Sequence, residues 1–172
     1  MSSEEFKLSY VLSLLSELNE ELSYERICET SQEQKIEYRN KLNTFIMYNE
    51  MDKNSFNAPI DLKQKKGESL EALASYLVEI SGSLFTVERN LRTTTNEIDQ
   101  IFILNPKGKA LVSAGILDKK FEKFLGECKN YNKAIDVTYV GKFCSLLLTN
   151  QIKLGIMFSY YGVSGSGWKD AS

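Results

Sequence analysis

Glu127 and Lys129 are the residues of this chain whose types and spacing most directly suggest chemistry. If their segment is a strand, alternation places both on one face of a sheet and turns Cys128 to the other. A carboxylate there can bind a divalent metal ion, while the ammonium orients a water molecule and offsets phosphate charge. Asp99 stands just before the apolar run 101–104 and offers a second carboxylate at the start of a neighbouring strand.

The apolar segments around these three charged residues make the pattern informative. A Glu-x-Lys pair by itself is also what a solvated strand shows by chance. Here, however, all three charges adjoin or interrupt apolar segments, where uncompensated charge is costly. A bound cation or an ion pair is therefore expected among them.

The absence of histidine narrows the chemistry further. It excludes a Ser-His-Asp triad, a Cys-His pair and a histidine-ligated zinc within this chain. Three cysteines, an odd number at no metal-ligand spacing, are expected to be reduced thiols. Hydrolysis would have to rest on carboxylates, lysines and hydroxyls, for which a carboxylate-held Mg²⁺ is the natural partner.

Composition sets the class of protein. The apolar share of 42% and the charged share of 26% fit a globular domain with a real core. No apolar run is long enough to cross a bilayer and no signal sequence is evident, so we expect a cytoplasmic protein without a membrane partner. The first 60 residues are acidic and the remainder is mildly basic, which permits contact with phosphates.

Helical patterns fill the N-terminal part of the chain. Apolar residues at steps of three and four predict helices over 4–23 and 31–50, with Ser31 and Gln34 as a capping box. They would form a helical hairpin packed on the main domain, or a dimer or partner interface, and the sequence does not separate these readings. Residues 51–66 are expected to be a linker with a lysine-rich patch, before a helix over 68–81 that Gly82 ends.

The C-terminal part of the chain has the hydrophobic pattern of a β-sheet. Alternation and apolar runs predict strands over 84–92, 96–104, 124–131 and 154–161, with a helix over 134–150. Asn105–Gly108 is expected to be a turn, and residues 109–123 are ambiguous. This order predicts an α/β fold whose last strand–helix–strand unit is a right-handed crossover.

Several of these segments resemble the catalytic domain of Mrr-type restriction endonucleases, in the PD-(D/E)xK nuclease superfamily. The matching segments are Lys66–Leu73 for the first helix, Asn96–Asp99 for a metal-binding aspartate at a strand start, Gly126–Tyr131 for the second half of the motif, and Leu154–Ser159 with Gly162–Gly167 for the last strand and its loop. The resemblance implies a three-layer α/β/α sandwich with a mixed central sheet over 66–172, preceded by a helical extension over 1–60.

The resemblance also implies roles for the matched residues. Asp99 and Glu127, with the backbone carbonyl of Cys128, would hold Mg²⁺, for which Mn²⁺ can substitute. Lys129 would position the attacking water, and Glu71 would complete the site from its helix. Glu71 can equally be an ordinary exposed helix residue. Four basic residues are further candidates for phosphate contact, although a solvated surface is the common fate of each: Arg89, Arg92, Lys133 and Lys142.

The function implied is metal-dependent endonucleolytic hydrolysis of DNA, in restriction or defence against foreign DNA. The alternatives are a structure-selective nuclease, such as a junction resolvase, and an inactive nucleic-acid-binding or assembly module. The helical N-terminus is consistent with a homodimer. The end of the chain at Ser172 is consistent with further domains of a longer chain. The glycine-rich stretch 162–167 lacks the lysine of a phosphate-binding P-loop, and Trp168 is expected to pack.

Overall fold

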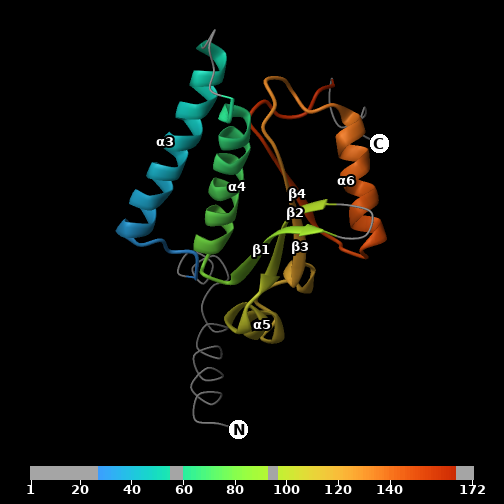
Figure 1. The fold of residues 1–172 in the computed structure, drawn as a ribbon. Coiled ribbons are helices and arrows are strands. Elements are labelled where there is room, and N and C mark those ends of the chain that lie inside the picture. The colour runs from blue at the N-terminus through green and yellow to red at the C-terminus, as the bar shows by residue number, and fades with distance from the viewer. Residues whose placement is uncertain (1–26, 55–59, 93–96, 166–172) are drawn as a thin grey trace.

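The computed structural model describes residues 27–54, 60–92 and 97–165, shown in colour in Figure 1. The side chains of residues 54, 90–92 and 97 are outside this description. The helix expected over 4–23, the side chain of Arg92 and Trp168 therefore lie outside the described residues. None of the described helices is long and apolar enough to cross a membrane.

Two long helices, α3 (Gln32–Asn54) and α4 (Leu62–Ile80), lie side by side as a hairpin (Figure 1). The capping box at the start of α3 is confirmed: Gln34 N donates to Ser31 Oγ at 3.2 Å, and Ser31 N donates to Gln34 Oε1 at 2.8 Å. Phe45 of α3 packs with Leu70, Leu73 and Ala74 of α4. Apolar contacts between α3 and α4 thus hold the hairpin together.

The linker expected over 51–66 is wrong at both ends, because α3 continues to Asn54 and α4 begins at Leu62. A tertiary contact between the two helices explains why they extend into this segment. Lys66 is only 3% exposed, and its ammonium lies 2.8 Å from Asp52 Oδ2 of α3 and donates to Asn132 Oδ1. A lysine that seemed to belong to a solvated patch is part of a buried ion pair between the helices.

Four strands form one mixed sheet in the order β1-β2-β3-β4. They are β1 (Phe85–Arg92), β2 (Glu97–Leu104), β3 (Lys123–Lys129) and β4 (Gly155–Ser159). The pairs β1–β2 and β2–β3 are antiparallel, whereas β3–β4 is parallel. The predictions of an α/β fold and a mixed sheet are confirmed, and the helix between the parallel strands is α6 (Val137–Thr149).

Side chains alternate between two apolar layers on this sheet. Phe102 and Phe124 pack with Val78 of α4. Their neighbours Ile101 and Leu125 pack with Phe143 and Leu146 of α6. Alternation therefore sorts the side chains of β3, and of β2 from Gln100 onward, between the two helices, whereas Ile98 at the start of β2 also packs in the α6 layer.

The expected turn Asn105–Gly108 is wrong, because the segment begins helix α5 (Pro106–Ser113). Asn105 caps it by accepting a hydrogen bond from Gly108 N at 3.1 Å, and Pro106 occupies the first turn. Asparagine and proline favour a helix start as much as a turn, so the signal was ambiguous. A short 3₁₀ helix, η1 (Lys119–Phe121), then leads into β3.

Gly126 in β3 gives a first testable prediction. A Cβ at this position would lie 2.6 Å from Cε2 of Phe102 and 3.2 Å from Oε1 of Gln100. We expect Gly126→Ala to lower the free energy of unfolding by about 1–3 kcal/mol through overpacking, measured by urea denaturation. The matched control is Gly141→Ala in α6, where a Cβ meets nothing within 4 Å. Helix propensity should stabilise that variant by up to about 1 kcal/mol, and equal effects of the two changes would contradict the prediction.

Candidate active site

The candidate site lies where β2 and β3 part. Their backbone pairing runs from Ile103–Lys123 to Gln100–Gly126 and ends there. Beyond that point Cys128 N donates to the side chain of Asp99, at 2.9 Å from Oδ2. The aspartate carboxylate thus takes the place of a main-chain acceptor, which fixes it between the two strands.

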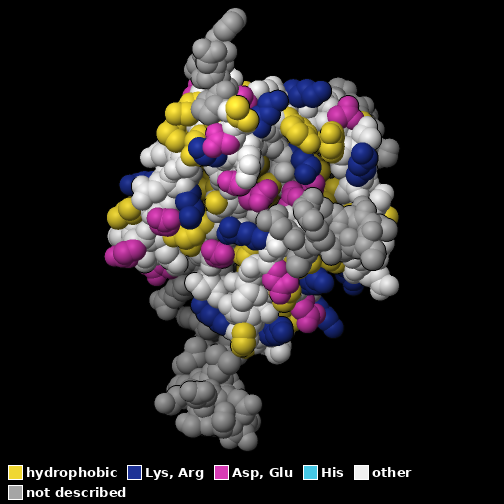
Figure 2. All heavy atoms as spheres, in the orientation of Figure 1, with side chains coloured by type: hydrophobic (Ala, Val, Ile, Leu, Met, Phe, Trp, Pro, Cys, Tyr) yellow, Lys and Arg dark blue, Asp and Glu magenta, His cyan; other side chains and the backbone are white. Residues whose placement is uncertain are grey.

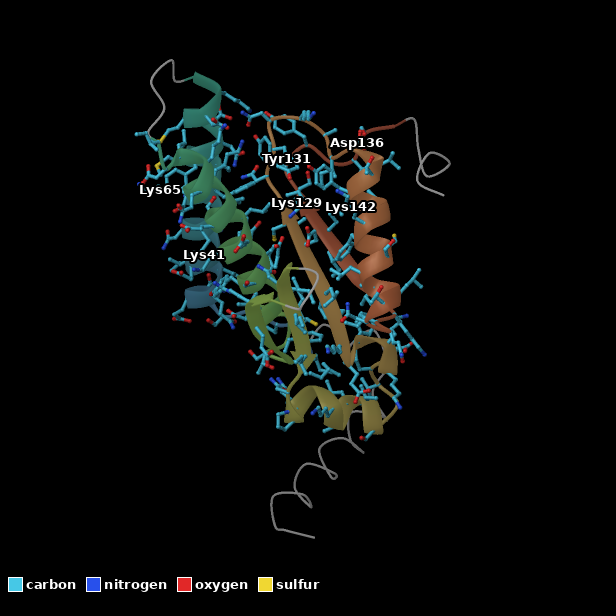
Figure 3. All side chains as sticks on the ribbon, turned by 45° about the vertical axis from the view of Figure 1, so that its right-hand side comes forward. Lys41, Lys65, Lys129, Tyr131, Asp136 and Lys142 are labelled. Carbon is cyan, nitrogen blue, oxygen red and sulfur yellow. The ribbon has the colours of Figure 1, made fainter. Side chains whose placement is uncertain are left out.

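Lys129 joins the two carboxylates of the predicted motif. Its Nζ lies 2.6 Å from Glu127 Oε1 and 3.5 Å from Asp99 Oδ2. The three side chains are 16–21% exposed, so they are largely buried but reachable from solvent. Glu127 and Lys129 have the parity of Leu125, which faces α6, and Figure 3 shows Lys129 at the upper end of β3. The structure therefore brings together the three residues singled out from the sequence.

The site concentrates negative charge. Burial raises the pKa of Glu127 above its ordinary value, and the Asp99 carboxylate beside it raises that pKa further. Burial lowers the pKa of Lys129, but its hydrogen bond to Glu127 and the Asp99 charge outweigh this effect, and the pKa ends raised. Lys129 is consequently an ammonium at neutral pH and acts as a charge and hydrogen-bond donor, not as a base.

Glu71 approaches the same region from α4. Burial raises the pKa of its carboxyl, and the nearby Asp99 charge raises it further. Its backbone carbonyl accepts a hydrogen bond from Gln100 Nε2 at 2.7 Å. The helix carboxylate named from the sequence is therefore within electrostatic reach of Asp99.

Gln100 is a positioning residue that sequence reasoning missed. It is fully buried, and its hydrogen bond to the Glu71 carbonyl ties α4 to β2 one residue after Asp99. Its Oε1 has no hydrogen-bond partner among the described atoms. A polar residue inserted before the apolar run 101–104 was the available signal.

Within the described residues, no group of three or more Asp, Glu, Cys or His side chains is arranged to hold a metal ion. The donor set nevertheless fits Mg²⁺, which takes one or two protein carboxylates and fills its shell with waters and substrate phosphates. Asp99 and Glu127 share one ammonium and are crowded enough for Asp99 to raise the pKa of Glu127. A divalent cation would relieve that crowding.

Cys128 contributes through its main chain. Its thiol is buried on the opposite face, against Leu70 and Leu73 of α4. Burial, with Asp99 and Glu71 nearby, raises the pKa of this thiol. A thiolate ligand is therefore disfavoured at neutral pH, while the carbonyl between Glu127 and Lys129 is the oxygen that the family resemblance assigns to the metal.

Aromatic and basic side chains surround the upper end of β3. Tyr131 and Tyr139 have ring centroids 5.6 Å apart, and the Lys142 ammonium lies 5.5 Å from the centroid of Tyr139 (Figure 3). Of the other basic residues suggested as phosphate contacts, Arg89 and Lys133 are exposed. These cations remain candidates for contact with a charged substrate.

Comparisons of the chain with family models, with curated proteins and with solved structures found no match. The family resemblance therefore rests on the motif residues and on the geometry described above.

Proposed function

We propose that the chain is a metal-dependent nuclease of the PD-(D/E)xK kind. The observation that carries the proposal is the Lys129 ammonium, 2.6 Å from Glu127 and 3.5 Å from Asp99, at the point where two neighbouring strands separate. Two carboxylates and a lysine in this arrangement suit phosphodiester hydrolysis, because the reaction needs a cation, a positioned water and neutralisation of phosphate charge.

The proposed architecture is a three-layer α/β/α sandwich of the restriction-endonuclease type. It is supported by the apolar packing of α4 on one parity of β2 and β3 and of α6 on the other. The order of two antiparallel pairs followed by one parallel pair agrees with the mixed central sheet that the resemblance implies. Under this proposal, α3 belongs to the extension that precedes the nuclease core.

In the proposed mechanism, Asp99, Glu127 and the carbonyl of Cys128 would hold Mg²⁺, which would lower the pKa of a bound water and supply positive charge at the phosphate. Lys129 donates a hydrogen bond that orients the attacking water, and its charge offsets the charge developing on the phosphate oxygens. Glu71, whose carboxyl pKa is raised by burial and by the nearby Asp99 charge, is proposed to complete the site and to accept the proton. Gln100 holds Glu71's helix against β2.

DNA is the proposed substrate, and restriction or defence is the proposed role, because the motif residues resemble those of Mrr-type enzymes. The test is incubation with supercoiled, linear and branched DNA in Mg²⁺ or Mn²⁺, with EDTA as control. Nicking that requires the metal supports the proposal, and preference for the branched substrate would indicate a structure-selective nuclease. No metal-dependent cleavage of any of the three would overturn the nuclease proposal.

The raised pKa of Glu127 gives a prediction for metal binding. Protons compete with the cation for a carboxylate, and here that competition begins above the ordinary value of 4.5. We expect Mn²⁺ affinity, measured by calorimetry, to fall progressively as the pH is lowered from 7 to 5. Glu127→Gln should bind more weakly and lose much of this dependence. Constant wild-type affinity over that range would contradict the prediction.

A further inference from the structure

A hollow lined by lysines lies at the opposite end of the sheet from the candidate active site. Its volume is about 520 Å³, and it is bordered by η1, the start of β3 and the segment that follows α6. Five exposed lysines line it: Lys109, Lys119, Lys120, Lys123 and Lys153. We refer to it as the lysine hollow, and Figure 2 shows dark blue side chains around this lower end of the molecule.

The lysine hollow carries a positive surplus. Among the residues that the structure describes, its acidic lining residues are Asp118 and Glu122. Asp118 is already engaged, since its Oδ1 accepts from Lys120 N at 2.8 Å and its Oδ2 lies 3.3 Å from Lys120 Nζ. Lys119, Lys123 and Lys153 form no ion pair with any described residue, so their charges are open to a ligand.

The lysine hollow and the candidate site lie on the same side of the sheet. Lys123 and Lys129 are on one strand with the same parity, six residues apart. At about 3.3 Å per residue the separation is roughly 20 Å. Successive phosphates of a B-form strand advance about 3.4 Å along the helix axis, so the span corresponds to roughly six base pairs.

The outer surface of α6 connects the two places, and the acidic residue at its start, Asp136, is engaged as the N-cap by accepting a hydrogen bond from Thr138 N. Lys142 is the only charged residue between Val137 and Thr149. A shallow groove along this helix is lined mainly by small residues, including Thr138, Gly141 and Ser145, beside Lys142. A polyanion can approach this groove closely, because half or more of its described lining residues are small and none is a carboxylate.

We propose that the lysine hollow is an accessory binding site for the phosphate backbone of a nucleic acid, about six base pairs from the bond at the candidate active site. This inference rests on the proposed nuclease function for its ligand. The lysines contribute affinity and register and take no part in cleavage, because they lie roughly 20 Å from the candidate active site.

The experiment measures binding of a fluorescent 30-base-pair duplex by anisotropy in EDTA, at several salt concentrations. The variant is Lys119→Gln/Lys123→Gln/Lys153→Gln. The control is Lys35→Gln/Lys41→Gln/Lys65→Gln, which removes the same charge from the α3–α4 hairpin, where Figure 3 labels Lys41 and Lys65. We expect at least tenfold weaker binding for the first variant, with a salt slope shallower by about 2–3, and a change below about twofold for the control.

The decisive comparison is between wild type and the first variant on this 30-base-pair duplex. Equal affinities of these two proteins for that duplex, or equal losses in the two triple variants, would overturn the inference. Because binding is measured without metal, a protein that binds as expected but never cleaves DNA refutes the nuclease proposal alone. Cleavage by wild type together with unchanged binding in the first variant refutes the accessory site alone.

Discussion

Lys129→Ala is expected to slow metal-dependent DNA cleavage at least about a hundredfold while leaving Mn²⁺ binding at pH 8 as tight as in wild type, or tighter. The ammonium sits between Glu127 and Asp99 and competes with a cation for both carboxylates. Removing it frees those ligands but also removes the donor that orients water and balances phosphate charge, a loss typically worth a factor of about 10²–10³. Plasmid nicking rates and calorimetry on the same preparations measure the two effects.

Asp99→Ala is the informative comparison, because it should lose both cleavage and metal binding. Its fold must be checked by circular dichroism, since Asp99 also accepts a hydrogen bond from Cys128 N. Lys35→Ala, an exposed lysine on α3, controls for the loss of one positive charge. Wild-type cleavage by Lys129→Ala, or loss of its metal binding, would contradict the assigned role of Lys129.

Lys66→Met is expected to be among the most destabilising single substitutions, lowering the free energy of unfolding by about 3–5 kcal/mol. Lys66 is 3% exposed and Asp52 is 12% exposed, with 2.8 Å between Nζ and Oδ2. Removing the lysine leaves the Asp52 carboxylate in a largely dry environment without its counter-charge, and leaves Asn132 without its donor. Urea denaturation at pH 7 measures the loss.

Two controls separate an unpaired buried charge from ordinary loss of an ion pair. Lys66→Met/Asp52→Leu should recover most of the stability, because apolar residues can replace a buried pair. Lys41→Ala breaks the more exposed pair with Glu37, whose side chains are 30% and 48% exposed, and should cost less than about 1 kcal/mol. A cost for Lys66→Met as small as that of Lys41→Ala would refute the argument.

The same pair predicts a pH dependence. The hydrogen bond from Lys66 lowers the pKa of Asp52 below its ordinary value of 3.8. A carboxyl whose pKa is depressed by folding stabilises the protein above its unfolded pKa and loses that contribution as the pH falls through the folded value. Wild type should therefore lose this part of its stability on acidification below about pH 4, and Lys66→Met should lack it.

The elements that alternation and helical periodicity determine could be predicted from the sequence. The strand expected over 96–104 is β2 (Glu97–Leu104), and the helix expected over 134–150 is α6. One error occurred at Asn105–Gly108, where the same residues favour a turn and a helix start. The other occurred where a tertiary contact overrides local composition. Lys66 belonged to a polar, lysine-rich stretch, and only its burial against Asp52 shows that the stretch continues as helix.

The candidate site was likewise only partly predictable from the sequence. Asp99, Glu127 and Lys129 could be selected because each is a charge at or inside an apolar segment. The end of the backbone pairing at Gln100–Gly126 could not be predicted, because it depends on the divergence of two strands in space. The same applies to Gln100, whose hydrogen bond spans from β2 to α4 and leaves no periodic signature.

The hydrogen bond from Cys128 N to Asp99 has a consequence for the middle position of Glu-x-Lys. What that position gives to the site is main-chain atoms: an amide proton, which nearly every amino acid carries, and the carbonyl oxygen proposed as a metal ligand. Its side chain points into the opposite layer, so only the packing against α4 limits which side chains fit. The motif can thus accept many residue types at its centre, with proline as the exception, since a proline would leave Asp99 without the donor that anchors it.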